Sequence, residues 1–357
     1  MRAADETSVA FDRARNAVDT ALAQAGPELA VCEFLFGGER VRMRSAGHNL
    51  AHHLSRPFSH LSVANDPTAT ASLTIDVWDE RKVHVPYPSE SDINPADTSW
   101  PGGHGMLSVS PATRFLRYDC SSWVTWLDRA AGRIVAWRAN SDRLSMHERT
   151  RPLPFLLPVW YADRGLHIIH AGLVARDDTG ILFCGHNGAG KSTTSLACLC
   201  AGLDFLSDDH VGLVEHKGQY VGHSVFASTR LEPDHLERSF PELLPHAIKS
   251  DEWFESKSLV LVGEAMPERV RRWAPIKAIV LPVQVNQPSS RLQPVSRAEA
   301  LRALAPSTLM QMPFGATATR FRELAQLTMT VPAYRLELGR NIAAIAPSVR
   351  DLMDKIS

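Results

Sequence analysis

The sequence predicts an α/β protein with two domains, and three observations support this expectation. From about residue 160 onward, buried strand patterns alternate with loops and helices, which is typical of an α/β domain. Before residue 150, one helical pattern is followed by short strand-like segments between turns, which indicates a smaller β-rich α+β domain. Three prolines interrupt the pattern between residues 148 and 158, so we expect domains at 1–150 and 151–357.

The first domain is expected to begin with an amphipathic helix. Phe11, Ala14 and Val18 fall at helical spacing, and Gly26 with Pro27 stops the pattern. Strand patterns follow at residues 30–36, 39–45, 71–79, 106–111 and 133–139. Five of the eight tryptophans lie in this part and are expected to fill its core: Trp78, Trp100, Trp123, Trp126 and Trp137.

The second domain shows the strand–loop–helix order more clearly. Strands are predicted at residues 166–175, 181–185, 204–214, 274–283 and 332–339, and helices at 191–203, 296–305, 318–329 and 342–356. The turn at 176–180 joins the first two strands into a hairpin, which would bring the strand of His170 alongside residues 181–185.

Composition excludes several classes of protein. The 357 residues carry 38 Lys and Arg against 39 Asp and Glu, so a nucleic-acid binder that works by bulk positive charge is excluded. No apolar run approaches the roughly 20 residues that cross a bilayer, and the charged first segment lacks a signal peptide. Five scattered cysteines indicate neither a disulfide framework nor a zinc site. We therefore expect a cytoplasmic protein without a membrane span or a nucleic-acid partner.

One motif in the sequence indicates a ligand-binding site. Residues 185–192 read Gly-His-Asn-Gly-Ala-Gly-Lys-Ser, which matches G-x-x-x-x-G-K-[ST] between a predicted strand and a predicted helix. The glycines let backbone N–H groups point at phosphates, Lys191 reaches the β- and γ-oxygens, and the Ser192 hydroxyl can bind Mg²⁺. The motif predicts a P-loop (Walker A) site for a nucleoside triphosphate, formed by Gly185, His186, Asn187, Gly188, Ala189, Gly190, Lys191, Ser192 and Thr193.

Acidic residues are expected beside this loop. Asp208 and Asp209 follow the strand that begins at residue 204, where one carboxylate would hold Mg²⁺ and the other would accept a proton from a substrate hydroxyl. Which of the two takes which role is left open. By contrast, the acidic pair at 177–178 lies in the hairpin turn and is expected on the surface. His170 is either a buried structural residue or a catalytic one, and His186 faces the γ-phosphate or solvent.

Two families share features with this pattern. The loop is similar to the first nucleotide motif of ABC transporter ATPases, but 184 residues precede it and no LSGGQ-like string follows, so that family is rejected. The order IIHAGLV, GHNGAGKS, FLSDDHV resembles the HPr serine kinase/phosphorylase superfamily, whose nucleotide core is shared with ATP-dependent phosphoenolpyruvate carboxykinase. The resemblance covers roughly residues 160–350, and its specific motifs lie around 170–210.

The resemblance implies a P-loop fold and a set of roles. His170 would lie near the transferred phosphate, Lys191 would bind the β- and γ-phosphates, and Ser192 would bind Mg²⁺. Asp208 and Asp209 would supply metal binding and the general base. Thr193 stands where the bifunctional enzymes commonly have an acidic residue, and their Arg-Gly-containing loop has no counterpart here. The resemblance therefore does not imply the phosphorylase reaction or HPr as the substrate.

These features predict a Mg²⁺- and ATP-dependent kinase that phosphorylates a hydroxyl, either a serine of a protein or peptide or a small-molecule alcohol. Two alternatives stay open: an ATPase switch that acts on a partner, and a binding module regulated by nucleotide. The absence of a guanine-specifying N-K-x-D string favours ATP. The acceptor is not readable from the sequence, and a homo-oligomer is left open.

Overall fold

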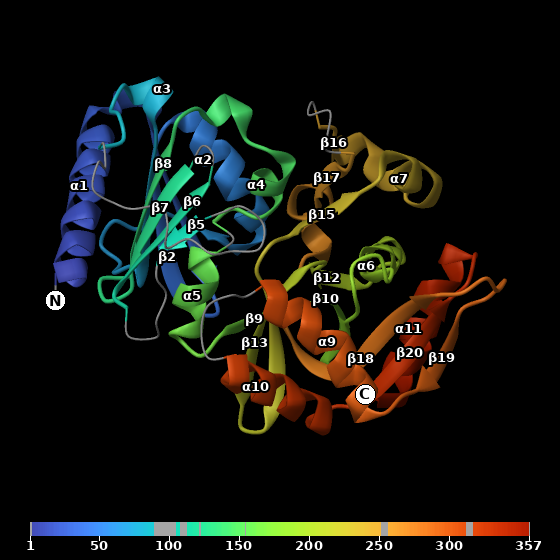
Figure 1. The fold of residues 1–357 in the computed structure, drawn as a ribbon. Helices are drawn as coiled ribbons and strands as arrows, with labels where there is room; N and C mark the ends of the chain where they lie inside the picture. The colour runs from blue at the N-terminus through green and yellow to red at the C-terminus, as the bar shows by residue number, and fades with distance from the viewer. Residues whose placement is uncertain are drawn as a thin grey trace. The chain divides into compact units, whose positions relative to one another are not determined.

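The computed structural model describes residues 2–88, 105–107, 113–120, 123–153, 155–250, 256–311 and 317–356. The chain forms two compact units, one of residues 1–56 and 61–160, the other of residues 57–60 and 161–357. Both combine helices with sheets (Figure 1), so the expectation of an α/β protein is confirmed at the level of class. No helix in the described ranges is long and apolar enough to cross a membrane.

The first unit is built on an eight-stranded sheet with the order β3-β1-β2-β4-β8-β7-β6-β5. The neighbours β2, β4 and β8 run parallel, while the remaining pairs are antiparallel. Its elements are α1 (Arg2–Gln24), β1 (Leu29–Phe36), β2 (Glu39–Ala46), α2 (His48–Ser55), β3 (Ser62–Val63), β4 (Leu73–Asp79), α3 (Glu80–Val83), β5 (Gly105–Leu107), β6 (Phe115–Cys120), β7 (Trp123–Asp128), β8 (Arg133–Arg138), α4 (Met146–Thr150) and α5 (Leu156–Ala162), which ends in the second unit.

Helix α1 covers one face of this sheet through the side that its sequence spacing predicts. Phe11, Ala14 and Val18 are buried in a cluster with Trp78 and Trp126 of the sheet. Trp123 is also buried and Trp137 packs against the same cluster, so four of the five tryptophans help to form the core, and Trp100 lies outside the described residues. The strand predicted at 106–111 overlaps β5, and its last four residues also lie outside the described ranges.

The second unit is built on a nine-stranded sheet that follows the order β12-β10-β11-β18-β14-β13-β9, with β20 beside β18 and β19 beside β20. Its elements are β9 (His167–His170), β10 (Gly172–Arg176), β11 (Thr179–Phe183), α6 (Lys191–Cys200), β12 (Asp204–Ser207), β13 (His210–His216), β14 (Gln219–Ser224), β15 (Ser228–Leu231), α7 (Pro233–Ser239), β16 (Ala247–Ile248), β17 (Ser258–Leu261), α8 (Val262–Ala265), β18 (Trp273–Gln284), β19 (Arg291–Pro294), α9 (Arg297–Gln311), α10 (Thr317–Thr330), β20 (Ala333–Leu338) and α11 (Ile345–Ile356).

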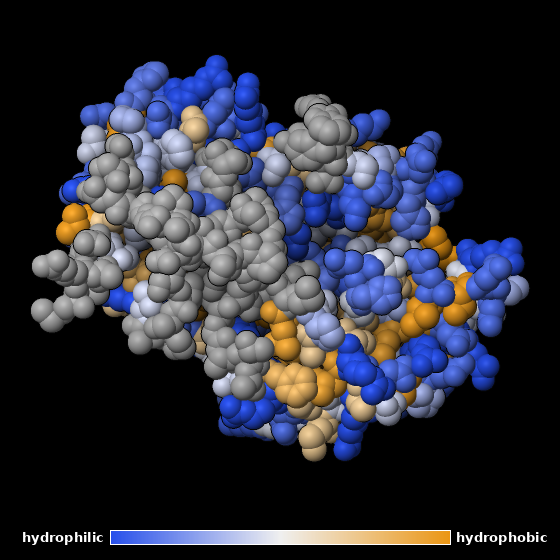
Figure 2. Space-filling view, viewed as in Figure 1, coloured by the Kyte–Doolittle hydropathy of each residue, from blue (hydrophilic) through white to orange (hydrophobic). Residues whose placement is uncertain are grey.

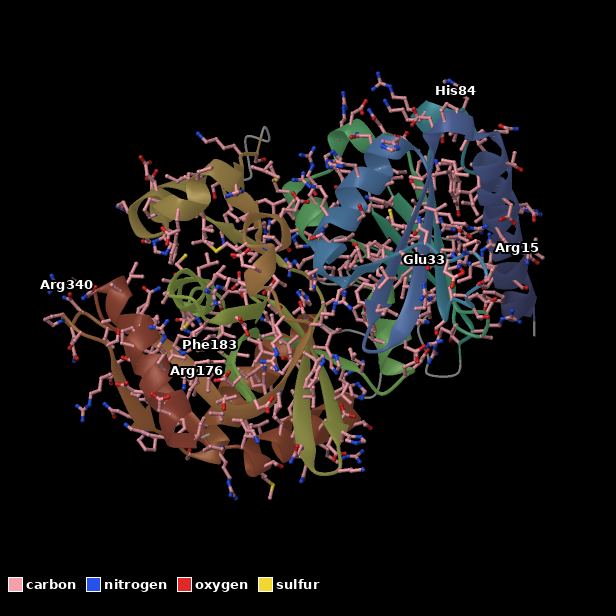
Figure 3. All side chains as sticks on the ribbon, turned by 180° about the vertical axis from the view of Figure 1, so that it is seen from behind. Arg15, Glu33, His84, Arg176, Phe183 and Arg340 are labelled. Atoms are coloured by element: carbon pink, nitrogen blue, oxygen red, sulfur yellow. The ribbon has the colours of Figure 1, made fainter. Side chains whose placement is uncertain are left out.

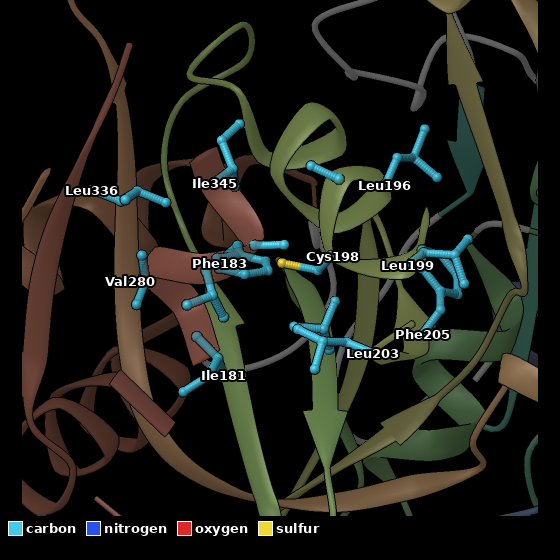
Figure 4. Close-up of a cluster of buried hydrophobic side chains, with 14 of the residues drawn as sticks. Ile181, Phe183, Leu196, Cys198, Leu199, Leu203, Phe205, Val280, Leu336 and Ile345 are labelled. Carbon is cyan, nitrogen blue, oxygen red and sulfur yellow. The ribbon is translucent and has the colours of Figure 1, made fainter. Parts of the chain in front are cut away.

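Two hydrophobic clusters cover the opposite faces of the nine-stranded sheet. Ile181 and Phe183 pack with α6 and α11 (Figure 4), while the alternate residues Leu182 and Cys184 pack with α9 and α10. Because successive residues of a strand point to opposite faces, a strand covered on both sides reads as a continuous apolar run. This explains why residues 181–184 show no polar alternation.

Apolar side chains are not all buried. Figure 2 shows apolar side chains gathered near the lower edge of the view, over the region where α9 and α10 lie. On α10, Phe321 and Met329 are exposed, at 44% and 57% of their surface.

Candidate functional site

The glycine-rich loop, residues 185–192, lies over the carboxyl ends of three parallel strands. It follows β11, and β18 runs parallel to both β11 and β20. Gln284 at the end of β18 donates its side-chain N–H to the Gly188 carbonyl at 3.1 Å. Gly190 has φ +105°, and a Cβ there would lie 2.4 Å from the Leu338 side chain at the end of β20. Only glycine fits that position, which caps the N-terminus of α6.

Lys191 is the first residue of α6 and is only 7% exposed. Its Nζ donates to the carbonyls of Gly185 at 3.0 Å and of His186 at 3.2 Å. Burial lowers the pKa of Lys191, while the charges of Asp209 and Asp208 act in the opposite direction. The ammonium group therefore lies inside the loop, within electrostatic reach of both carboxylates.

Asp208 is buried, and only one of its two carboxylate oxygens accepts a hydrogen bond from the described residues. Thr229 Oγ1 of β15 donates to Oδ2 at 2.5 Å, whereas no described residue makes a hydrogen bond to Oδ1. Burial raises the pKa of Asp208 to about 6, since the hydrogen bond from Thr229 offsets it only in part. Asp209 raises this pKa further, and Ser192 and Lys191 lower it, so both of these residues lie close to the carboxylate.

Asp209 lies between two histidines. His170 Nε2 is 2.6 Å from Asp209 Oδ1, and His210 Nδ1 is 3.6 Å from Oδ2. The strands explain this arrangement, because β9 pairs with β13 so that His170 stands directly opposite His210. The side chain of Asp209 is 34% exposed, whereas that of His170 is 3% exposed.

The strand predicted across residues 166–175 is present but is divided into β9 and β10 by a single residue. The residue between the two strands is Ala171, whose N–H donates to the Asp209 carbonyl at 3.2 Å. β9 pairs with β13, while β10 lies between β11 and β12. The pairing of β10 with β11 ends at Gly172 and Phe183, so His170 is not paired with residues 181–185. It meets Asp209 because residues 167–175 pair with residues 204–213 in nearly one register. A continuous apolar pattern cannot show which distant segment a strand pairs with.

The remaining predicted residues differ in their surroundings. His186 and Asn187 are exposed, and His186 Nδ1 lies 2.7 Å from the Asn187 carbonyl oxygen. Thr193 Oγ1 lies 3.0 Å from His235 Nε2 of α7. The structure thus brings together Lys191, Ser192, Asp208, Asp209 and His170, with His186 and Asn187 at the exposed side of the loop.

Sequence reasoning missed three residues of this site. His210 directly follows the acidic pair and could have been found as its neighbour on a strand. Thr229 and His235 come from β15 and α7, far along the chain, and no short motif points to them.

A separate cavity of about 630 Å³ lies between the β13–β14 hairpin and α10, lined among others by His167, Tyr220, Arg322 and Glu323. None of the predicted site residues lines it. His167 and His170 are an odd number of residues apart on β9, so their side chains point to opposite faces of the sheet. This cavity therefore opens on the face away from His170 and Asp209.

No family model matches the chain, and no curated protein matches it. Among solved structures, the chain is similar to the Hpr(Ser) kinase/phosphatase from Coxiella burnetii, with 14% sequence identity and a TM-score of 0.29. The similarity covers 53% of this chain and 97% of that chain. A likeness with that TM-score does not indicate a function.

Proposed function

We propose that the protein is an ATP- and Mg²⁺-dependent phosphotransferase that moves the γ-phosphate to a hydroxyl acceptor. The observation that carries this proposal is the buried carboxylate of Asp208, whose Oδ1 accepts no hydrogen bond from the described residues. It lies next to Ser192 and Lys191 at the start of a helix that follows a glycine-rich loop. A buried oxygen without a partner costs stability unless a ligand satisfies it.

The residues fit Mg²⁺. The Ser192 hydroxyl and the Asp208 carboxylate are hard oxygen donors, and Mg²⁺ typically takes one or two protein carboxylates together with waters and phosphates. Within the described ranges no cluster of three or more His, Cys, Asp and Glu side chains suits a metal, so a cage made by the protein alone is not what we propose. When bound, Mg²⁺ neutralises charge on the β- and γ-phosphate oxygens.

Residues of the chain itself bind the phosphates and accept the proton. Lys191 and the backbone N–H groups at the start of α6 bind the phosphates. Asp209 accepts the acceptor's hydroxyl proton while the hydroxyl oxygen bonds to the γ-phosphorus and the bond to the bridging oxygen of ADP breaks. We assign the proton to Oδ2 of Asp209, because His170 already contacts Oδ1 and holds the carboxylate in place.

The exposure of the two aspartates supports different roles for them, which the sequence left open. Asp208 is 5% exposed and held by Thr229, as suits a metal ligand. The Asp209 side chain is 34% exposed, so an acceptor can reach it. We therefore assign the metal to Asp208 and the general base to Asp209.

The order of His170, the glycine-rich loop and the acidic pair resembles HPr serine kinases, and we extend the proposal to that type of enzyme. The acceptor is then a serine of a protein or peptide, or a small-molecule alcohol. Asp209 is also accessible to water, which makes an ATPase switch the second candidate.

Label transfer from γ-labelled ATP tests the proposal. We expect purified protein with Mg²⁺ to label an acceptor in a cell extract that is split into macromolecular and small-molecule fractions. Asp209→Asn should lower transfer by about 100-fold or more because the general base is lost, while ATP affinity stays within a few-fold. Label released only as free phosphate would instead support the ATPase switch. Transfer that Asp209→Asn leaves intact would contradict the assignment of the base.

A further inference from the structure

The turn that carries Asp208 and Asp209 follows a β-bulge. β12 pairs with β10 so that Ser207 faces Leu173 and Phe205 faces Val174, which leaves Leu206 without a partner in this ladder. A bulge bends its strand and redirects the side chains that follow, and bulges are frequent next to active sites. The direction of the two carboxylates therefore depends on how this bulge is held.

Ser207 closes the turn from one side. Its hydroxyl donates to the His210 carbonyl at 2.6 Å and accepts from the His210 N–H at 3.1 Å. These two bonds fix the ends of the turn that contains the acidic pair. They do not reach the bulged residue itself.

A second hydroxyl holds the bulged residue. Ser224 of β14 is 3% exposed and donates its proton to the carbonyl of Leu206. A buried carbonyl outside the ladder requires such a donor. A serine hydroxyl has one proton, so Ser224 must accept in its contact with His60 Nε2, which lies 2.7 Å away. His60 is thereby fixed as the tautomer with hydrogen on Nε2.

His60 is anchored in the second unit although it comes from the first part of the sequence. Residues 57–60 belong to the second unit, where the Ala227 N–H donates to the Pro57 carbonyl at 2.9 Å. Arg272 Nε donates to the His60 carbonyl at 3.0 Å. Burial, and then the charge of Arg272, lowers the pKa of His60 to about 3, so its ring stays neutral at physiological pH.

We propose that His60 is a positioning residue that acts through Ser224 on the Leu206 carbonyl and so keeps the bulge, and with it Asp209, in the geometry needed for phosphoryl transfer. Its effect on catalysis rests on the proposed function, but the hydrogen-bond chain from His60 to Leu206 does not. The structure thus links a segment near residue 60 to a catalytic turn about 150 residues later.

Three variants test this chain of contacts. His60→Leu removes the Nε2–H donor, whereas His60→Gln offers an amide N–H at a similar distance from the backbone. Ser59→Ala is the matched control, because Ser59 is a neighbour in the same segment and its buried Oγ has no hydrogen-bond partner among the described residues. We expect His60→Leu to lower kcat by about 10- to 100-fold, since misplacing a catalytic group by about 1 Å has effects of this size. The Kd for ATP should change less than about threefold in every variant, and His60→Gln and Ser59→Ala should keep kcat.

Hydrogen exchange provides a readout that does not depend on activity. We expect faster exchange of the amides of residues 205–210 in His60→Leu, and wild-type rates in His60→Gln and Ser59→Ala. If the wild type shows no ATP turnover, the proposed function fails. The exchange rates alone then show whether His60 holds the bulge in place. If His60→Leu does not fold, Ser224→Ala takes its place with the same expectations. Unchanged exchange in the variant that lacks the bond, or equal losses in His60→Leu and His60→Gln, would overturn the proposal.

Discussion

Three buried carboxylates of the first unit are paired with arginine, whereas Asp208 of the second unit is not. In the first unit, Glu33, Asp76 and Asp128 are all at most 2% exposed, and each contacts an arginine. Glu33 belongs to β1 and is labelled over the sheet of the first unit in Figure 3. In the second unit, Asp208 is also buried, but its hydrogen bond comes from the Thr229 hydroxyl rather than from a guanidinium group.

The pKa directions follow from this difference. Burial alone would raise the pKa of Glu33, but hydrogen bonds from Arg42 and Arg40 outweigh it and lower the pKa overall. For Asp208 burial dominates, and the pKa rises to about 6. A carboxylate matched by arginine is already neutralised and serves the fold.

Asp79 of the first unit is fully buried without an arginine, but both of its oxygens accept hydrogen bonds, from the Arg81 N–H and from Ser141. Asp208 differs because its Oδ1 accepts none from the described residues, and we propose that this oxygen is kept for a cation.

The largest expected effect on stability is in the first unit. Asp76 is fully buried, with Arg44 Nε 2.6 Å from Oδ1 and Arg133 Nη2 2.7 Å from Oδ2. Asp76→Asn removes the buried charge that pairs with both guanidinium groups, of which only Arg133 keeps another carboxylate, Asp19, so we expect the free energy of unfolding to fall by about 3 kcal/mol. Urea unfolding followed by tryptophan fluorescence measures this, because the first unit contains several buried tryptophans.

Asp142→Asn is the control for that measurement. Asp142 is 44% exposed, and its ion pairs with Arg81 and Lys82 are longer, at 3.6 Å each. We expect this variant to stay close to wild type. If Asp76→Asn were equally mild, arginine pairing would not be what stabilises the buried acids of the first unit, and the comparison between the units would fail.

Asp208→Asn is expected to raise the free energy of unfolding, whereas Asp76→Asn lowers it. The folded-state pKa of about 6 lies above the ordinary value of 3.8, so the ionised carboxylate costs stability. That cost is absent below the ordinary pKa, grows as the pH rises toward about 6, and is constant above it. Because one pKa unit corresponds to about 1.4 kcal/mol, the variant should be more stable than wild type by about 2 to 3 kcal/mol at pH 8.

Two measurements sharpen this prediction. Unfolding in a chelating buffer should show the gain of Asp208→Asn at pH 8, about half of it at pH 5, and almost none near pH 3.5. Mg²⁺ with ATP should then stabilise the wild type more than the variant, because the proposed ligand is missing in the variant. A variant that is less stable than wild type at pH 8 without metal would show that Asp208 is a structural residue like Asp76.

Much of the fold could be predicted from periodicity. The spacing of Phe11, Ala14 and Val18 predicts α1 correctly, and the apolar run at 181–184 predicts a strand covered on both faces. Pairing between distant strands could not be predicted. Nothing near His170 indicates that this residue ends its strand, or that the strand pairs with residues 210–213, because strand order depends on tertiary packing.

The site could be predicted in part for the same reason. Lys191, Ser192 and the acidic pair lie within a short stretch of chain, and local patterns indicate them. Thr229 and His60 contribute through contacts with residues far away in the sequence, and only the folded chain shows those contacts. The bulge at Leu206 could not be predicted either, because the pattern of residues 204–207 is that of an ordinary strand.

The smallest effect is expected at the other acidic pair, Asp177 and Asp178, which the sequence places in a turn. Their side chains are 93% and 89% exposed, and their contacts with Arg176 and Arg271 are long, at 3.9 and 3.8 Å. Asp177 has φ +52°, a left-handed conformation that asparagine also accepts. Changing both to Asn should therefore alter the free energy of unfolding by less than about 0.5 kcal/mol and leave ATP turnover unchanged, as unfolding and label-release assays would show. If this double variant lost turnover as Asp209→Asn does, burial beside the loop would not be what separates a catalytic acidic pair from a surface one.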